Sequence, residues 1–92
     1  MAEQLNLNTI VPTRGEMRIL NALWDLGEAT IEEIIKYFSF SSPPNYKTIQ
    51  TLVRIMEEKG LAKHIKRGRV FVFVATVTRD QVIRLSVRTL LD

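Results

Sequence analysis

The sequence contains no cysteine, and this absence excludes disulfide bonds and thiolate metal sites. The cytoplasm is the ordinary compartment of such a chain, so we expect a cytoplasmic protein. No apolar run approaches the roughly 20 residues of a membrane-spanning helix. The first residues, MAEQLNLNTIVPT, lack the basic start and apolar centre of a signal peptide. The sequence therefore indicates neither secretion nor membrane insertion.

Groups suited to catalysis are also scarce. His64 is the only histidine, and a closed metal site needs about four ligands, so this residue does not indicate a metal centre. No Ser-His-Asp set, glycine-rich phosphate loop or carboxylate pair stands out. A chain of 92 residues forms one domain at most and buries one modest core without a large active-site cleft. We expect no enzyme, no catalytic residue, no metal and no cofactor.

Charge is distributed unevenly along the chain. The net charge is +3, but residues 1–44 carry three basic side chains against six acidic ones, whereas residues 45–92 carry ten against four. The second half is therefore suited to a polyanion and the first half is not. A hydrophobic content of 46% with mixed charges is typical of a folded domain.

The segment from Asn45 to Lys59, NYKTIQTLVRIMEEK, has the clearest helical pattern. Asn45 stands where an N-cap belongs, and Gly60 stands where the helix should end. The apolar residues recur with the period of one helical face: Ile49, Leu52, Val53 and Met56. The opposite face is polar and basic, with no acidic residue before Glu57.

That polar face is suited to the major groove of DNA. Amide and guanidinium groups match base edges there, and hydroxyl and ammonium groups match phosphates. The candidate DNA-binding residues of this helix are Tyr46, Lys47, Thr48, Gln50, Thr51 and Arg54. Lys47 and Thr48 fall in the first turn, where backbone N–H groups also bind phosphate. The alternative is an ordinary amphipathic helix with a solvated polar face.

Two of these candidates have more than one interpretation. Arg54 matches either a bidentate contact to guanine or a phosphate contact. Tyr46 matches either stacking on a sugar or phosphate of DNA, or contact with the turn at Pro43 and Pro44.

Two further helices are predicted before this segment. Thr13 and Glu16 form the pattern of a capping box, and Gly27 ends the first helix. Its buried face holds Met17, Leu20, Leu23 and Trp24, with Trp24 expected in the core. Thr30 and Glu33 open the second helix in the same way. This helix buries Ile31, Ile34, Ile35 and Phe38, and a turn at Ser41–Pro44 ends it.

After Gly60 the pattern changes from helix to strand. Residues 61–65 are expected to be extended, residues 66–69 form a basic turn with Gly68 at a positive φ, and residues 70–74 form a β-branched and aromatic strand. We expect Phe71 and Phe73 to face the core. Arg67 and Arg69 flank the glycine and are predicted to contact the DNA backbone.

Thr78 and Gln81 open a last helix. This helix has more apolar surface than one face needs: Val82, Ile83, Leu85, Val87, Leu90 and Leu91. Because the pattern is unfinished at Asp92, we expect a partner, either another chain or residues beyond this sequence.

The order of elements predicts a mainly α fold with a small β-hairpin, a winged helix-turn-helix. It has a three-helix core, a two- or three-stranded wing and a C-terminal helix. We divide the chain into a flexible N-terminal arm (1–11), a winged-helix DNA-binding domain (12–77) and the start of a C-terminal helix leading to a dimerisation region (78–92). A winged helix used as a protein–protein module without DNA binding is the alternative.

Two stretches, PTRGEMRILNALWDLGEATIEEI and YKTIQTLVRIMEEKGLAKHIKRGRVFVF, resemble the penicillinase-repressor family. That family includes the penicillinase, methicillin-resistance and copper-transport repressors. The resemblance rests on Pro-Thr-x-x-Glu, Leu-Trp, Gly-Glu-Ala-Thr, Lys-Thr-Ile-Gln-Thr-Leu, Glu-Lys-Gly-Leu and Arg-Gly-Arg before a strand. It runs from Pro12 to about Thr78.

The resemblance implies a bacterial cytoplasmic repressor that occludes a promoter by binding an inverted-repeat operator as a homodimer. The groove-facing motif of the family carries over onto Lys47, Thr48, Gln50, Thr51 and Arg54, and its wing onto Arg67, Gly68 and Arg69. The dimerising helices and the metal-binding cysteines of copper-type members are absent here. The inducing signal is therefore unassigned, and a monomer is compatible with this sequence.

Overall fold

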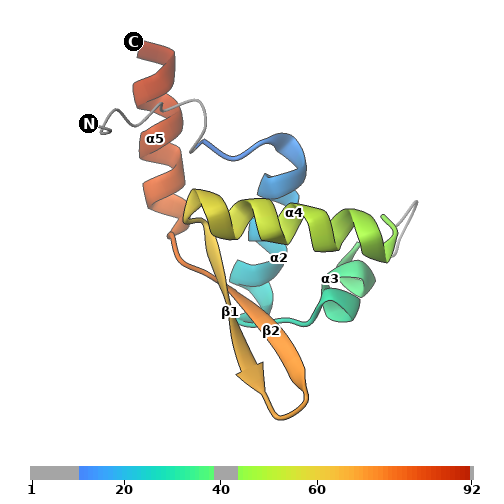
Figure 1. Ribbon diagram of the computed structural model, residues 1–92. Coiled ribbons are helices and arrows are strands. Elements are labelled where there is room, and N and C mark those ends of the chain that lie inside the picture. Colours follow the sequence, from blue (N-terminus) through green and yellow to red (C-terminus); the bar gives the residue numbers. More distant parts are fainter. Residues whose placement is uncertain (1–10, 39–43, 92) are drawn as a thin grey trace.

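The computed structural model describes residues 11–38 and 44–91, with side chains described as far as Val87. The elements in chain order are α2 (Arg14–Leu26), α3 (Ile31–Tyr37), α4 (Tyr46–Lys59), β1 (Ala62–Arg67), β2 (Val70–Ala75) and α5 (Arg79–Leu91) (Figure 1). This order confirms the predicted winged helix-turn-helix. The predicted arm, apart from Val11, and residues 41–43 of the predicted Ser41–Pro44 turn lie outside the described residues, as do the side chains of Leu90 and Leu91.

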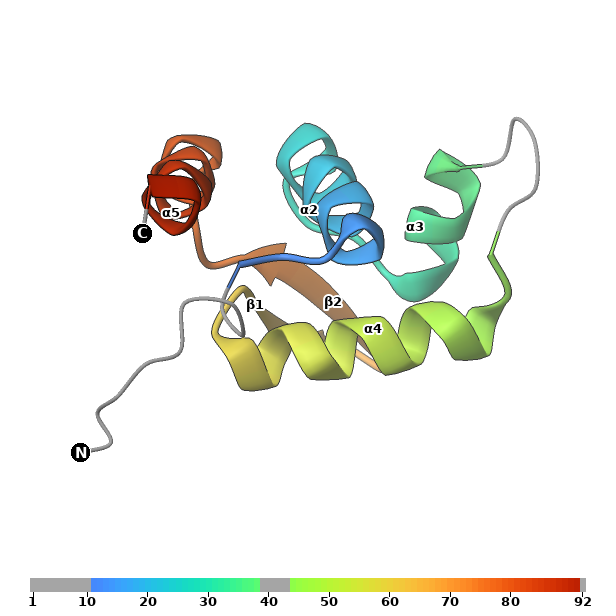
Figure 2. The same cartoon turned by 90° about the horizontal axis from the view of Figure 1, so that it is seen from above.

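The helices form two layers. In Figure 2, α5, α2 and α3 stand in a row, and α4 runs across the side of α2 and α3. The hairpin of β1 and β2 starts near the end of α4, and its tip extends beyond the helices (Figure 1). Among the described residues, none of the helices combines the length and apolar character needed to cross a membrane.

The helix starts follow from short-range sequence patterns. The side chains of Thr13 and Glu16 each accept a backbone N–H of the other residue, at 3.3 and 2.9 Å, and Thr30 and Glu33 do the same. Asn45 Oδ1 accepts the N–H of Thr48 at 2.8 Å. These contacts satisfy N–H groups that have no partner within their helices, so the predicted caps are confirmed. A reciprocal pair between Thr78 and Gln81 precedes α5 in the same way.

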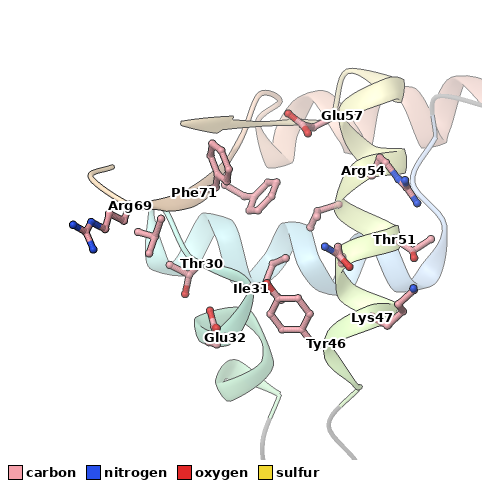
Figure 3. Close-up of a pocket in the computed structure, with 14 residues that line it drawn as sticks. Thr30, Ile31, Glu32, Tyr46, Lys47, Thr51, Arg54, Glu57, Arg69 and Phe71 are labelled. Carbon is pink, nitrogen blue, oxygen red and sulfur yellow. The ribbon is translucent and has the colours of Figure 1, made fainter. Parts of the chain in front are cut away.

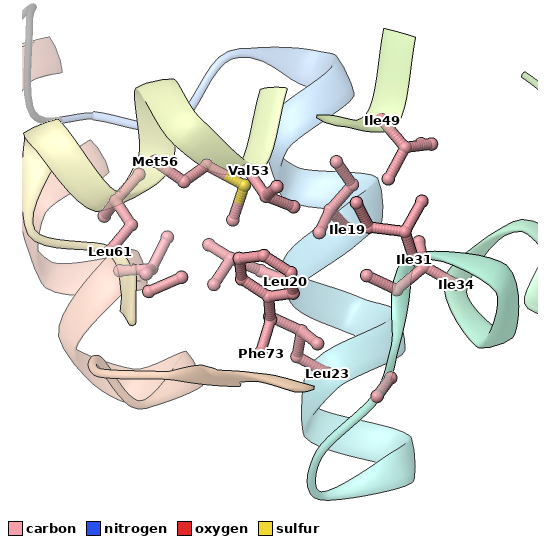
Figure 4. Close-up of a cluster of buried hydrophobic side chains, with 13 residues drawn as sticks. Ile19, Leu20, Leu23, Ile31, Ile34, Ile49, Val53, Met56, Leu61 and Phe73 are labelled. Carbon is pink, nitrogen blue, oxygen red and sulfur yellow. The ribbon is translucent and has the colours of Figure 1, made fainter. Parts of the chain in front are cut away.

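One hydrophobic core joins all the elements (Figure 4). Its fully buried side chains come from three helices and the segment after α4: Ile19, Leu20, Leu23, Ile34, Ile49, Val53, Met56 and Leu61. Trp24 is partly buried against this core, and its indole N–H donates to the Val77 carbonyl at 2.9 Å. The expected core role of Trp24 is confirmed, and the contact also ties α2 to the segment before α5.

Leu52 differs from its predicted place in the buried face of α4. Ile49, Val53 and Met56 are buried, but Leu52 is only partly buried, near Gly15 at the start of α2. The helical period places all four residues on one side of α4. The neighbouring helix covers only part of that side, which leaves Leu52 at the edge of the core.

A buried ion pair connects the start of α2 with the end of α4. Glu16 Oε1 accepts both the N–H of Thr13 at 2.9 Å and the Lys59 ammonium at 2.7 Å. The Glu16 side chain is 2% exposed and that of Lys59 is 17% exposed. Such a carboxylate is tolerated in the core because a counter-charge and a backbone donor replace its water.

The hairpin has a two-residue turn. β1 and β2 pair antiparallel in a register that joins Arg67 to Val70, so Gly68 and Arg69 form the turn. Gly68 has a φ of 65°, whereas Arg69, like every described residue other than glycine, does not have a positive φ. A glycine of positive φ at the first turn position is typical of a type II′ turn. The first strand therefore runs two residues beyond its predicted end. Ala29 forms an isolated bridge with Phe73, which adds a short third partner.

The prediction that Phe71 faces the core is wrong, whereas that for Phe73 is confirmed. Phe73 is 8% exposed and Phe71 is 53% exposed. Both residues lie on the same face of β2, because side chains alternate along a strand. The described helices cover the base of the hairpin but not its outer part, so Phe71 is left half-exposed.

We predict that Lys59→Met lowers the free energy of unfolding by about 3 kcal/mol or more, because it leaves the Glu16 carboxylate buried without a counter-charge. The double variant Glu16→Gln/Lys59→Met should be less destabilised than Lys59→Met, since no buried charge remains. Urea unfolding measures both. Lys47→Met, an exposed change on the same helix, is the control and should stay within about 0.5 kcal/mol. A Lys59→Met variant as stable as the control would contradict the role of the pair.

The two phenylalanines of β2 give a second test. Phe73→Ala should cost about 3–5 kcal/mol by opening a cavity in the core. Phe71→Ala should cost about 1 kcal/mol or less, because half of this side chain is already in water. Thermal melting of the matched pair checks the difference, and equal losses would place Phe71 in the core after all.

Candidate nucleic-acid interface

A groove of about 570 Å³ lies between α4, the start of α3 and the wing. Six of the eight predicted DNA-binding residues line it: Tyr46, Lys47, Gln50, Thr51, Arg54 and Arg69. Five come from α4 and the sixth from the hairpin turn, so residues far apart in sequence meet at one surface. The structure leaves Thr48 and Arg67 outside this groove.

The groove residues of α4 project from two sides of the helix. Lys47, Thr51 and Arg54 follow the i, i+4, i+7 spacing and project from the side of α4 that faces away from Phe71 (Figure 3). Tyr46, 47% exposed, lies between α3 and α4. Apart from the half-buried Thr51, these side chains are exposed, because the apolar side of α4 faces the core.

Three cations at this groove are uncommitted. Within residues 11–38 and 44–87, the side chains of Lys47, Arg54 and Arg69 take part in no hydrogen bond or ion pair. The groove also contains the carboxylates of Glu32 and Glu57. Exposed cations without partners can bind an anionic ligand without first breaking an internal contact.

Arg67 differs from the other wing arginine. Its guanidinium binds Glu28, with Nη2 2.8 Å from Oε1 and Nε 3.2 Å from Oε2. Hydrogen bonding to Arg67 lowers the pKa of Glu28, and the same bond raises the pKa of Arg67. A carboxylate with a lowered pKa loses its favourable interaction only as the pH falls through that lowered value, so the pair is intact at neutral pH.

Thr48 lies at the exposed start of α4. Its backbone N–H is already bonded to the Asn45 side chain, so this group does not contribute a donor for an anion. The hydroxyl of Thr48 remains exposed. The predicted phosphate contact at the helix start therefore depends on Lys47 and on the Thr48 side chain.

The roles of Glu57 and Phe71 in the groove, and of His64 and Lys66 beside it, were not predicted from the sequence. Glu57 accepts the backbone N–H of His64 at 3.0 Å and lies 2.6 Å from its ring Nδ1. The ring of His64 meets that of Phe71 edge to face at 5.1 Å. Strand alternation also places the exposed Lys66 on the face of Phe71. The alternation could have indicated Lys66, but the exposure of Phe71 depends on where the helices end.

His64 takes part in this polar contact and not in a metal cluster. Among the described residues, no group of three or more histidine or carboxylate side chains could hold a metal ion.

Comparison with known proteins agrees with the fold. The family model described as Penicillinase repressor matches residues 12–92. The penicillinase repressor of Bacillus licheniformis is 30% identical over 78 residues, which cover 85% of this chain and 61% of that protein. An uncharacterised 16.5 kDa protein of Latilactobacillus sakei is 27% identical over 85 residues, covering 92% and 58%. The chain spans about three fifths of the length of these relatives.

Solved structures show the same relationship. The monomeric form of Bacillus licheniformis BlaI in complex with the blaP half-operator has a TM-score of 0.63 and 30% identity, covering 76% of this chain and 88% of that one. The DNA-binding domain of the repressor BlaI has a TM-score of 0.58 and 28% identity, covering 83% and 84%. An ArsR-family regulator with a TM-score of 0.61 and 21% identity, covering 99% and 87%, shares the fold.

The family model covers all but the first eleven residues, and the quoted motifs lie at the helix caps, the core and the groove. This protein therefore belongs to the penicillinase repressor family.

Proposed function

We propose that this domain binds operator DNA as the DNA-reading part of a bacterial transcriptional repressor, and that it blocks transcription by occupying the promoter. The observation that carries the proposal is the groove where Lys47, Arg54 and Arg69, which have no partner among the described residues, lie beside a polar helix face. The relative whose solved structure is described as a complex with the blaP half-operator supports it.

In this proposal α4 enters the major groove. Gln50, Thr51 and Arg54 contact base edges, since amide, hydroxyl and guanidinium groups can read them. Lys47 and Thr48 contact phosphate at the start of the helix, and Tyr46 packs on the sugar-phosphate backbone. The wing binds a neighbouring phosphate through Arg69.

We further propose that two copies read the two halves of an inverted repeat. Ile83 and Val87, one helical turn apart on α5, are 54% and 48% exposed, which supports an apolar contact made by this helix. The relative bound to a half-operator supports one copy per half-site. The bacterial cytoplasm, where such DNA is found, is the proposed location, and the division at residues 77 and 78 separates DNA reading from dimerisation.

The binding of duplex DNA should depend steeply on salt. The two cations placed on phosphate, Lys47 and Arg69, predict a slope of about −1.8 in log K against log salt concentration, and we expect a dissociation constant of about 10⁻⁴ to 10⁻⁶ M for random DNA near physiological salt. Fluorescence anisotropy from low to moderate salt measures both. Lys36→Ala, an exposed change outside the groove, should leave the slope unchanged. A flat salt response would indicate a protein–protein module instead.

Arg54→Ala should separate specificity from stability. Because Arg54 is exposed and has no partner in the described residues, its melting temperature should match wild type. Operator binding should weaken by about 1–3 kcal/mol, and discrimination at one base pair should relax. Ile49→Ala, on the buried face, is the opposite control and should cost about 2–5 kcal/mol of stability. Equal weakening on every DNA sequence would show that Arg54 holds a phosphate.

A further inference from the structure

We propose that Arg67 is a positioning residue, which sets the orientation of the wing through its ion pair with Glu28 and thereby places Arg69 at the DNA. The inference rests on the proposed function and assigns different roles to the two wing arginines. It replaces the expectation that both contact the DNA backbone.

The first observation is the geometry of the Arg67–Glu28 pair. Two nitrogens of the guanidinium meet the two oxygens of one carboxylate, at 2.8 and 3.2 Å. This bidentate arrangement restricts both the distance and the orientation of the two planar groups. A lysine ammonium at this position would restrict the distance to Glu28 but not the orientation of the strand, because it is a point charge on a flexible side chain.

The second observation is the pleat of the hairpin. Residues alternate between the two faces of β1, so Arg67 lies on the face opposite to His64 and Lys66. The groove face of the wing holds Phe71, which pairs with Lys66. Arg69 is in the turn, outside the alternation, and lines the groove. Arg67 therefore lies on the face opposite to Phe71 and Lys66, binds Glu28 and does not line the groove, whereas Arg69 does.

The third observation is a second anchor beside Glu28. Ala29 and Phe73 exchange two backbone hydrogen bonds, at 2.8 and 3.1 Å. This bridge holds the middle of β2, and Glu28 holds the last residue of β1. Two contacts from adjacent residues of one loop thus attach the wing at two points along its length.

The positions of these contacts determine what their loss would change. The hairpin tip extends beyond the helices (Figure 1). Beyond the bridge, and within the described residues, Arg67 makes the only hydrogen bond or ion pair between the wing and the rest of the domain. Without it, the strands can bend or twist about the Ala29–Phe73 bridge. Arg69, two residues past Arg67, would then sample positions away from the groove.

Glu28→Gln gives a test in which two models predict opposite signs. The variant removes a negative charge, so a simple charge model predicts tighter DNA binding. The positioning model predicts weaker binding, by about two- to fivefold, because the ion pair is lost. Glu58→Gln is the matched control, since it makes the same charge change at an exposed site that has no partner among the described residues. Fluorescence anisotropy with duplex DNA measures all three proteins.

Further variants separate positioning from phosphate contact. Glu28→Gln/Arg67→Gln should bind no more weakly than Arg67→Gln alone, since both changes break one interaction. The charge swap Glu28→Arg/Arg67→Glu should return to within about twofold of wild type. Arg69→Ala should lower the salt slope by about one unit, and adding Arg67→Gln to Arg69→Ala should lower it no further, because Arg67 acts only through Arg69. Tighter binding by Glu28→Gln, or a further fall in the slope when Arg67→Gln is added to Arg69→Ala, would overturn the proposal.

The orientation of the wing can also be measured without DNA. Residual dipolar couplings of the backbone amides report the direction of β1 and β2 relative to α2 and α4. Glu28→Gln and Arg67→Gln should both change the couplings of the hairpin and leave those of the helices as in wild type. Unchanged hairpin couplings would refute positioning, and absence of DNA binding by the wild-type protein would instead refute the proposed function.

Discussion

The buried carboxylate of Glu16 is the contact on which the placement of the groove depends. It accepts the N–H of Thr13 at the start of α2 and the ammonium of Lys59 at the end of α4. The wing begins directly after this point, where the Leu61 N–H donates to the Met56 carbonyl. The strand end returns to the same corner, because the Thr76 hydroxyl donates to the Gly60 carbonyl at 2.6 Å. One ionic contact thus fixes α4 relative to α2 at the place where the wing starts.

The basic residues of the second half of the chain divide into groups with different roles. Lys59 forms an ion pair with the buried Glu16, and Arg67 forms one with Glu28 in the loop between α2 and α3. Lys47, Arg54 and Arg69 remain available at the groove. A partnered cation must first lose its internal partner before it binds phosphate, so net charge alone overestimates the surface available to DNA. The number of cations without an internal partner is therefore a better measure of the surface available to DNA than the net charge.

The two misplaced apolar residues have the same cause. Periodicity correctly assigns Leu52 and Phe71 to the inner faces of α4 and β2. It does not state how far the neighbouring elements reach along those faces. Leu52 lies at the edge of α2, and Phe71 lies beyond the helices on the wing, where it meets His64. An apolar residue on an inner face is buried only where another element covers it, and that coverage depends on the lengths and crossing of the elements.

The helix starts, the order of elements, the hairpin and the polar face of α4 could be predicted from the sequence alone. These features depend on residues three or four positions apart, as in the Thr13–Glu16 cap, or on strand alternation, so the local pattern specifies them. Only the tertiary structure decided which charges are free and which aromatic residues are covered. Lys59 meets Glu16 across 43 positions, and Arg67 meets Glu28 across 39. Contacts over such separations depend on how the helices and the wing meet in space, which no local pattern contains.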